Sequence, residues 1–295
     1  MLQVPEAFSK FKQRLELTVT EQQDASRRQR RIRQIVDARF QVDHDFLTGS
    51  YKRDTKTKPL KDVDIFTVLG DDEAHYLDEP PSNVLTEVET ALVDEYGRNR
   101  VDVQRRSVRV DFGATLVDDL SGAVMSFDVT PAFPVGDHFV IPDRTTGDWM
   151  PTDPLVHAQA ATYANQAFNG EWKPVVKMIK KWNEYHNRPI KPSFLVEVMA
   201  LELLEDWGGS YPRELKAFFA TTIDAIDQTW EDPAGLGHPV SDRMASDSVL
   251  RSNAKTAVRA AEAVCTEAIN HEITGRGAAA LDSWQNLFGP AFAKS

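Results

Sequence analysis

The chain has 295 residues, a length that suits two modest domains or one large one. Its 41% hydrophobic and 27% charged residues are ordinary for a soluble globular protein, and no run of about 18 apolar residues predicts a membrane span. The formal net charge of −11 argues against broad electrostatic binding of long nucleic acid. The single cysteine, Cys265, excludes an internal disulfide, and the first residues lack a signal pattern, so we expect a cytoplasmic protein.

The N-terminal part of the chain predicts helix, strand, turn and strand in that order. Apolar residues recur at helical spacing from Ala7 to Phe40, which indicates one long helix or two. Gln41 to Leu47 predicts a strand, and Gly49 to Lys52 the start of a short helix. A cation-rich loop then leads to a strand from Asp62 to Leu69. We interpret five arginines in the helical part as a solvated face: Arg27, Arg28, Arg30, Arg31 and Arg33.

Further strands complete the predicted first half. A helix is expected from Ser82 to Tyr96 with Ser82 as its N-cap, followed by strands from Ser107 to Phe112 and from Ala123 to Thr130. The stretch from Pro134 to Pro154 is rich in Pro, Gly and Asp, which favours a connection with one short strand at His138 to Ile141.

The second half of the sequence has a helical pattern. Asp153 is expected to cap a helix whose first residue is Pro154. A looser tail rich in Gly and Ala follows the last predicted helix. The expected helices are Pro154 to Ala167, Pro174 to His186, Phe194 to Trp207, Tyr211 to Trp230 and Ser246 to Asn270.

Two aspartates lie two residues apart in the strand after the cation-rich loop. Side chains of a strand alternate between its faces, so Asp62 and Asp64 project from one face while Val63 and Ile65 pack against the other. Two carboxylates so placed repel each other unless a cation lies between them, and Mg²⁺ accepts such hard oxygen ligands. The pair therefore predicts a metal site, with an exposed strand face as the alternative.

A Gly-Ser turn precedes this strand, and a third aspartate follows it in the chain. Gly49 allows close approach of the backbone, and exposed N–H groups with the Ser50 hydroxyl predict an anion-binding turn suited to a triphosphate. A plain turn is the alternative. Asp128 is either a polar residue at a strand end or a third ligand. With it, two Mg²⁺ sites about 3.5–4 Å apart could serve an in-line displacement.

Three residues of the second half could carry chemistry. Lys177 and Lys180 lie opposite an apolar helical stripe, a pattern that favours solvent exposure over binding of phosphates. Ser193 stands at a predicted helix start, where an N-cap is the default role and contact with a nucleobase the alternative. The seven histidines show no pair at the spacing of zinc ligands, and no P-loop, dinucleotide motif or nucleophilic triad is visible.

Taken in order, the Gly49-Ser50 turn and the Asp62-Val63-Asp64 strand resemble the signature of DNA polymerase β-like nucleotidyltransferases. With the segment Phe127 to Phe133, the Lys177 to Trp182 helix and the Pro192-Ser193 to Glu197 helix, the order is similar to that of oligoadenylate synthetases. It is also similar to that of the bacterial cyclic-oligonucleotide synthases called CD-NTases, which act in CBASS anti-phage systems. The resemblance covers roughly residues 41–270 of this sequence.

The resemblance implies an α+β fold. Residues 1–153 would form a polymerase β-like nucleotidyltransferase core, a mixed sheet with a long N-terminal helix, packed on an α-helical C-terminal half of residues 154–295. The implied activity is metal-dependent joining of ATP and other NTPs into a cyclic di- or trinucleotide second messenger, with release of pyrophosphate, in anti-phage defence. The alternatives are nucleotidyl transfer to RNA or protein, and a nucleotide-binding module without turnover.

The same resemblance assigns roles to residues. Asp62 and Asp64 would hold two Mg²⁺ ions, for which Mn²⁺ can substitute, and Asp128 would complete the catalytic metal and help to deprotonate the acceptor hydroxyl. We expect a monomer without membrane association, whose partner is a CBASS effector or regulatory protein. The residues implied to hold the nucleotide are Gly49, Ser50, Lys177 and Lys180 at the triphosphate and Ser193 near the donor base.

Overall fold

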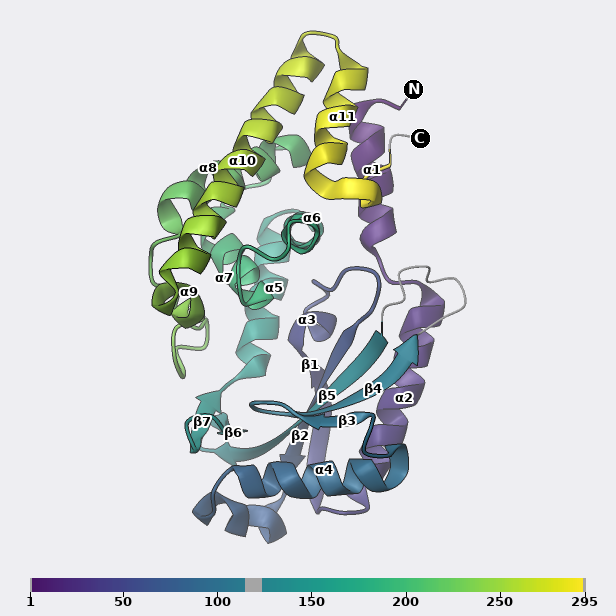
Figure 1. Cartoon of the computed structure of the whole chain (residues 1–295), viewed down its shortest axis with the longest axis vertical. Coiled ribbons are helices and arrows are strands. Elements are labelled where there is room, and N and C mark those ends of the chain that lie inside the picture. The colour runs from purple at the N-terminus through teal and green to yellow at the C-terminus, as the bar shows by residue number, and fades with distance from the viewer. Residues whose placement is uncertain (1, 115–123, 294–295) are drawn as a thin grey trace. The chain divides into compact units, whose positions relative to one another are not determined.

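The computed structural model describes residues 2–114 and 124–293 of the chain (Figure 1). Its contacts divide the chain into two compact units. We call Leu17–Ala158 the sheet unit, and Met1–Glu16 together with Gln159–Ser295 the helical unit. Within the described part, none of the helices combines the length and the apolar character needed to span a bilayer.

The N-terminal stretch forms two helices, α1 (Val4–Leu15) and α2 (Val19–Asp37). The second helix starts at a capping box. Thr18 Oγ1 accepts a hydrogen bond from the Glu21 backbone N–H at 3.2 Å, and the Glu21 carboxylate accepts one from the Thr18 N–H at 2.7 Å. Such reciprocal bonds satisfy two N–H groups that have no partner inside the helix, so they fix where α2 begins. Of the two alternatives in the sequence, the pair of helices is the one formed.

The sheet unit is built on a mixed sheet with the order β1-β2-β5-β4-β3, in which β2 and β5 run parallel and the other neighbours antiparallel. The strand β5 continues into a ribbon with β6 and β7. The elements of this unit after α2 are β1 (Val42–Thr48), α3 (Gly49–Lys52), β2 (Asp62–Leu69), η1 (Asp71–Asp78), α4 (Ser82–Tyr96), β3 (Val101–Val103), β4 (Val108–Ala114), β5 (Val124–Val135), β6 (His138–Asp143) and β7 (Asp148–Thr152).

The two faces of the central strand β2 have different cover. Val63 and Ile65 belong to the core that α2 and α4 form with the sheet (Figure 1). Phe66 and Val68, on the opposite face, pack in a smaller cluster with residues of β1, β5, β6 and β7. Alternation along the strand puts the two aspartates of β2 on this second face, beyond the end of the smaller cluster. The predicted α+β fold with a mixed sheet is confirmed.

The helical unit gathers helices from both ends of the chain around an aromatic core. Phe8 of α1 lies 5.0 Å from Trp284 and 5.1 Å from Phe292, measured between ring centroids. Cys265 is buried in this core, as predicted. The later elements are α5 (Pro154–Ala167), which begins in the sheet unit, α6 (Trp172–Tyr185), α7 (Ser193–Leu203), α8 (Tyr211–Ala225), α9 (Asp242–Ser246), α10 (Ser248–Ile273), α11 (Gly277–Phe288) and η2 (Gly289–Ala291).

Helix starts test the capping predictions. Asp153 Oδ1 accepts hydrogen bonds from the backbone N–H groups of Leu155 at 2.9 Å and Val156 at 3.3 Å, so the predicted cap of α5 is confirmed. The predicted cap of α4 is wrong. Pro81 occupies the N-cap position, and Ser82 is already the first helical residue.

Other differences lie where periodicity is weak. The tail is not loose, because α11 buries Trp284 and Phe288. The stretch interpreted as a connection contains a second strand, β7, paired with β6. The three residues of β3 pair with β4 and were not predicted. Ala123, the predicted first residue of a strand, lies outside the described residues.

Candidate active site

The pairing of β2 with β5 arranges the three predicted aspartates. In this parallel pair Asp62 lies opposite Ser126, and Asp64 lies opposite Asp128. Side chains of directly opposed residues point to the same face of a sheet, and so do residues two apart on one strand. The three carboxylates therefore lie on one face of two adjacent strands, at the end where β2 begins.

The predicted turn lies directly against one of these carboxylates. Thr48, the last residue of β1, pairs with Asp64. Gly49 follows with a φ of +61°, a conformation that side chains disfavour. A Cβ atom at this position would lie 1.7 Å from Asp64 Oδ2. Glycine is therefore required twice, by the backbone conformation and by the close approach of the carboxylate. Ser50 is the second residue of the four-residue helix α3.

An arginine that sequence reasoning missed joins two of the acids. Arg109 of β4 pairs with Asp128. Its Nε donates to Asp128 Oδ1 at 3.2 Å and its Nη2 to Oδ2 at 3.0 Å. The same Nη2 lies 3.8 Å from Asp62 Oδ1. Hydrogen bonding to Asp128, together with the charges of Asp128 and Asp62, raises the pKa of Arg109 above its ordinary value. The guanidinium is therefore a permanent positive charge within the site.

A lysine and a serine hold the first aspartate of β2. Lys56 Nζ donates to Asp62 Oδ2 at 3.2 Å, and Ser126 Oγ donates to Asp62 Oδ1 at 3.0 Å. Burial alone would raise the pKa of Asp62. The charge and hydrogen bond of Lys56, with the Ser126 hydrogen bond, outweigh burial and lower this pKa. Asp62 is therefore held as a carboxylate.

The second aspartate of β2 has the opposite electrostatic environment. Burial and the nearby charge of Asp128 raise the pKa of Asp64 to about 6, although Lys56 and Arg53 partly oppose this effect. Neighbouring carboxylates with pKa values moved in opposite directions are typical of functional sites. The difference shows that negative charge is in excess around Asp64.

The donor set suits a hard divalent cation. Three carboxylates supply the oxygen ligands that Mg²⁺ prefers, and the space left by Gly49 keeps Asp64 clear of a side chain. Among the described residues, no three His, Cys, Asp or Glu side chains are set together so that they could hold a metal ion. Asp62 and Asp128 instead direct their oxygens to Lys56 and Arg109. The residue types therefore fit a metal, and protein cations contact two of its three candidate ligands.

The other predicted residues belong to the helical unit. Lys177 is 2% exposed, and its Nζ lies 2.6 Å from Glu16 Oε2. Lys180 Nζ lies 2.8 Å from Oε1 of Glu197, and both side chains are largely buried. The interpretation of these lysines as solvent-exposed is therefore wrong, because a helical pattern does not reveal acidic partners on other helices. Ser193 is the first residue of α7 and not its N-cap, so that default role is wrong as well.

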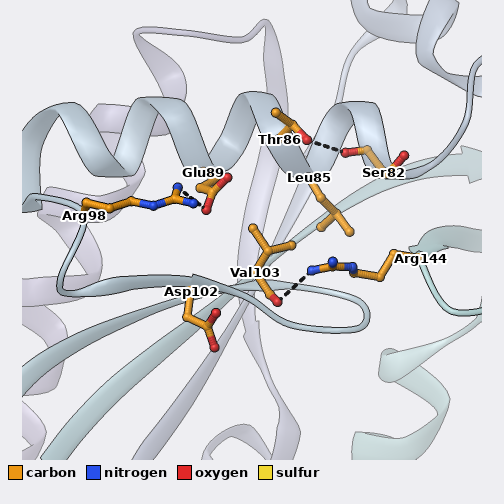
Figure 2. Close-up of a pocket in the computed structure, with 8 residues that line it drawn as sticks. All are labelled: Ser82, Leu85, Thr86, Glu89, Arg98, Asp102, Val103 and Arg144. Atoms are coloured by element: carbon orange, nitrogen blue, oxygen red, sulfur yellow. Dashed lines mark hydrogen bonds and ion pairs between the residues drawn. The ribbon is translucent and has the colours of Figure 1, made fainter.

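A pocket of about 270 Å³ lies elsewhere in the sheet unit, between α4, β3 and the turn that joins β6 to β7 (Figure 2). Its arginines are already bound, since Arg98 Nη1 donates to Glu89 Oε1 at 2.5 Å and Arg144 Nη1 to the Val103 carbonyl at 3.0 Å. None of the predicted site residues lines it. The residues that do are Ser82, Leu85, Thr86, Glu89, Arg98, Asp102, Val103 and Arg144. We therefore place the candidate chemistry at the carboxylates and not in this pocket.

Comparison with known proteins agrees with this arrangement. A family model described as the Second Messenger Oligonucleotide or Dinucleotide Synthetase (SMODS) domain matches residues 2–165. A probable cyclic nucleotide synthase of Bacillus cereus strain VD146 is 27% identical over 282 residues, covering 83% of this chain and 80% of that protein. A cyclic AMP-AMP-AMP synthase of an Acinetobacter strain is 27% identical over 271 residues, covering 85% of this chain and 73% of its own length.

Solved structures share the fold. The CdnC protein of Escherichia coli MS115-1, solved with ATP, superposes with a TM-score of 0.72 at 18% identity and covers 99% of each chain. The same protein in complex with HORMA gives a TM-score of 0.71 at 19% identity, with 98% of each chain covered. At such identities the likeness extends over the whole chain but concerns the fold alone.

Proposed function

The chain belongs to the Second Messenger Oligonucleotide or Dinucleotide Synthetase family, and from this premise we propose that Asp62, Asp64 and Asp128 are its catalytic carboxylates. It is a nucleotidyltransferase of the CD-NTase type that makes cyclic oligonucleotides, and membership of this group implies a role in CBASS anti-phage defence. The observation that carries the site assignment is the parallel register of β2 and β5, with Asp64 opposite Asp128.

The proposed reaction is an in-line displacement at phosphorus. The oxygen of a ribose hydroxyl attacks the α-phosphorus of a nucleoside triphosphate, a new P–O bond forms, and the bond to pyrophosphate breaks. The hydroxyl proton passes to the Asp128 carboxylate, whose orientation Arg109 fixes through two hydrogen bonds. Divalent cations held by the three carboxylates would supply positive charge against the attacking and leaving oxygens. We propose Mg²⁺ as the physiological ion, with Mn²⁺ as its substitute.

The nucleotide site is proposed at the turn after β1. Gly49 brings the backbone against Asp64, which supports a place for the triphosphate beside the carboxylates, with the Ser50 hydroxyl as a donor. Roles for Lys177, Lys180 and Ser193 in nucleotide binding stay predictions, since these residues belong to the helical unit. ATP is the proposed substrate, because a relative is named a cyclic AMP-AMP-AMP synthase and the E. coli CdnC structure contains ATP.

Regulation by another protein is a further part of the proposal. The E. coli CdnC structure in complex with HORMA supports a regulatory protein as a partner of this chain. A CBASS effector that responds to the product would act downstream. A monomeric enzyme outside any membrane stays our prediction for the chain on its own.

Mass spectrometry of the products tests the function. The purified protein is incubated with Mg²⁺ or Mn²⁺ and each mixture of ribonucleotides, and the products are treated with phosphatase before analysis. We expect phosphatase-resistant cyclic oligonucleotides, and their complete loss in the Asp62→Ala, Asp64→Ala double variant. Label from an α-³²P nucleotide that migrates with RNA or protein would show transfer to a macromolecule instead. Nucleotide binding without pyrophosphate release under any condition would show a binding module.

A further inference from the structure

Arg109 is placed where a bound cation would compete with it. Its guanidinium contacts both carboxylate oxygens of Asp128 and reaches to 3.8 Å from Asp62. The Asp128 side chain is 12% exposed and that of Arg109 is 36% exposed, so the pair is partly shielded from water. A two-point contact of this kind fixes orientation as well as charge, because the planar guanidinium matches the two oxygens of a carboxylate.

The charges around Arg109 determine which cations the site accepts. Arg109 and Lys56 together offset most of the negative charge of the three carboxylates. A bare divalent ion that approaches Asp62 and Asp128 is attracted by the acids but repelled by the guanidinium beside them. A divalent ion that arrives with a nucleoside triphosphate brings several negative charges of its own. The phosphates offset this repulsion and can themselves interact with the two protein cations.

We propose that Arg109 is a positioning residue that makes cation loading depend on the nucleotide. It orients Asp128 and keeps bare divalent ions weakly bound, so that the site fills when a cation and a triphosphate arrive together. The inference rests on the proposed catalytic role of Asp62, Asp64 and Asp128 and adds to it a residue on the neighbouring strand. Since coupling between two ligands is reciprocal, the cation must also strengthen binding of the nucleotide more in the wild type than without Arg109.

Titration of Mn²⁺ tests the inference without relying on turnover. Free Mn²⁺ is measured by electron paramagnetic resonance as it is added to the wild type and to Arg109→Gln, first alone and then with a saturating non-hydrolysable ATP analogue. We expect Arg109→Gln to bind bare Mn²⁺ about tenfold more tightly, because one positive charge has left the site. With the analogue present, the difference should shrink to about threefold or less.

Two control variants separate charge from shape and site from fold. Arg109→Lys keeps the charge and loses the planar fork, so its affinity for bare Mn²⁺ should stay near that of the wild type. Asp64→Asn removes a proposed metal ligand and should weaken Mn²⁺ binding in every condition. Thermal melting in EDTA shows whether each variant folds. Arg109→Thr, a neutral β-branched residue suited to a strand, replaces the glutamine variant if that variant does not fold.

The outcomes distinguish this inference from the proposed function. If Asp64→Asn weakens Mn²⁺ binding but Arg109→Gln leaves bare affinity unchanged, the role of Arg109 is wrong and the metal site stands. An equal gain with and without the analogue would overturn the dependence on nucleotide. If Asp64→Asn binds Mn²⁺ like the wild type, the error lies in the proposed metal site itself.

Discussion

Two groups of buried acids in the sheet unit are held by arginines, but with opposite balances of charge. At one end of β6, Asp143 accepts hydrogen bonds from Arg105 Nε at 2.7 Å, Arg106 Nε at 3.0 Å and the Thr145 backbone N–H at 3.1 Å. Although burial opposes ionisation, these donors lower the pKa of Asp143 to about 2. One carboxylate thus has two guanidinium groups, and it joins the β3–β4 hairpin to the β6–β7 hairpin.

At the candidate active site the proportion is reversed. Asp128 and Asp62 share Arg109, and burial with the charge of Asp128 raises the pKa of Asp64 to about 6. An acid with more donors than it needs is a structural joint. Acids with too few donors retain negative charge that a cation or phosphate-bound metal can use. The ratio of donors to carboxylates therefore separates structure from function in this protein, and each prediction below tests that difference.

Removal of the acids of β2 should have the largest effect. The Asp62→Ala, Asp64→Ala double variant should lose at least about a thousandfold in product formation, since the charge that stabilises the displacement is gone. Its thermal stability should not fall, because like charges that repel each other have been removed. Product is quantified by liquid chromatography and unfolding by circular dichroism. Activity within tenfold of the wild type would place the chemistry elsewhere.

Loss of the structural acid should affect stability and leave chemistry intact. We expect Asp143→Asn to lower the free energy of unfolding by about 3–5 kcal/mol, because Arg105 and Arg106 are left without their buried carboxylate. Urea unfolding at pH 7 measures this. The folded fraction should keep the wild-type rate per molecule. A variant as stable as the wild type would mean that Asp143 does not act as a joint.

Gly49→Ala should connect the two effects. The added Cβ would meet Asp64 Oδ2, and displacement of a catalytic group by about 1 Å lowers rates by about a hundredfold. Gly136→Ala is the matched control, since Gly136 has a φ of +62° but a Cβ added there would meet nothing within 4 Å. Both variants should lose about 1 kcal/mol of stability to backbone strain. Only Gly49→Ala should lose activity, measured as the rate of product formation; equal rates would remove Asp64 from the site.

The smallest effect concerns pH. The pKa of Asp143 is about 2 in the folded protein against an ordinary value of 3.8, so the unfolded chain binds its proton at a higher pH. The stability that this difference provides, about 2 kcal/mol, is present above about pH 4 and lost as pH falls towards 2. Unfolding of the wild type and Asp143→Asn across this range should converge at low pH. A constant gap between their unfolding free energies would contradict the shift.

Local signals in the sequence were sufficient where chemistry and geometry lie close together in the chain. The alternation around Asp62 and Asp64 fixed the face of the strand, and Asp153 beside Pro154 marked the start of a helix. Arg109 was missed because its partner Asp128 lies across a strand pair, and such pairing has no local signature. One signal was present: Arg109 and Asp111 alternate with valines, which puts two polar side chains on one face of β4.

Errors in the second half have the same origin. The segment before Trp284 is rich in Gly and Ala, so its helical tendency is weak on its own. Packing of Trp284 against Phe8, from the opposite end of the chain, stabilises the helix. The acidic partners of Lys177 and Lys180 are likewise on other helices or near the end of α1. Tertiary contacts, and not local pattern, determined these features.

The discontinuous make-up of the helical unit bears on how the chain matures during translation. Residues 17–158 are continuous, so this unit can fold as soon as it leaves the ribosome. The segment before it, including Phe8, finds Trp284, Phe288 and Phe292 only when nearly all of the polypeptide has been made. Its exposed aromatic side chains are a target for chaperones throughout that interval. Full assembly, and with it the nucleotidyltransferase, must therefore await the end of synthesis.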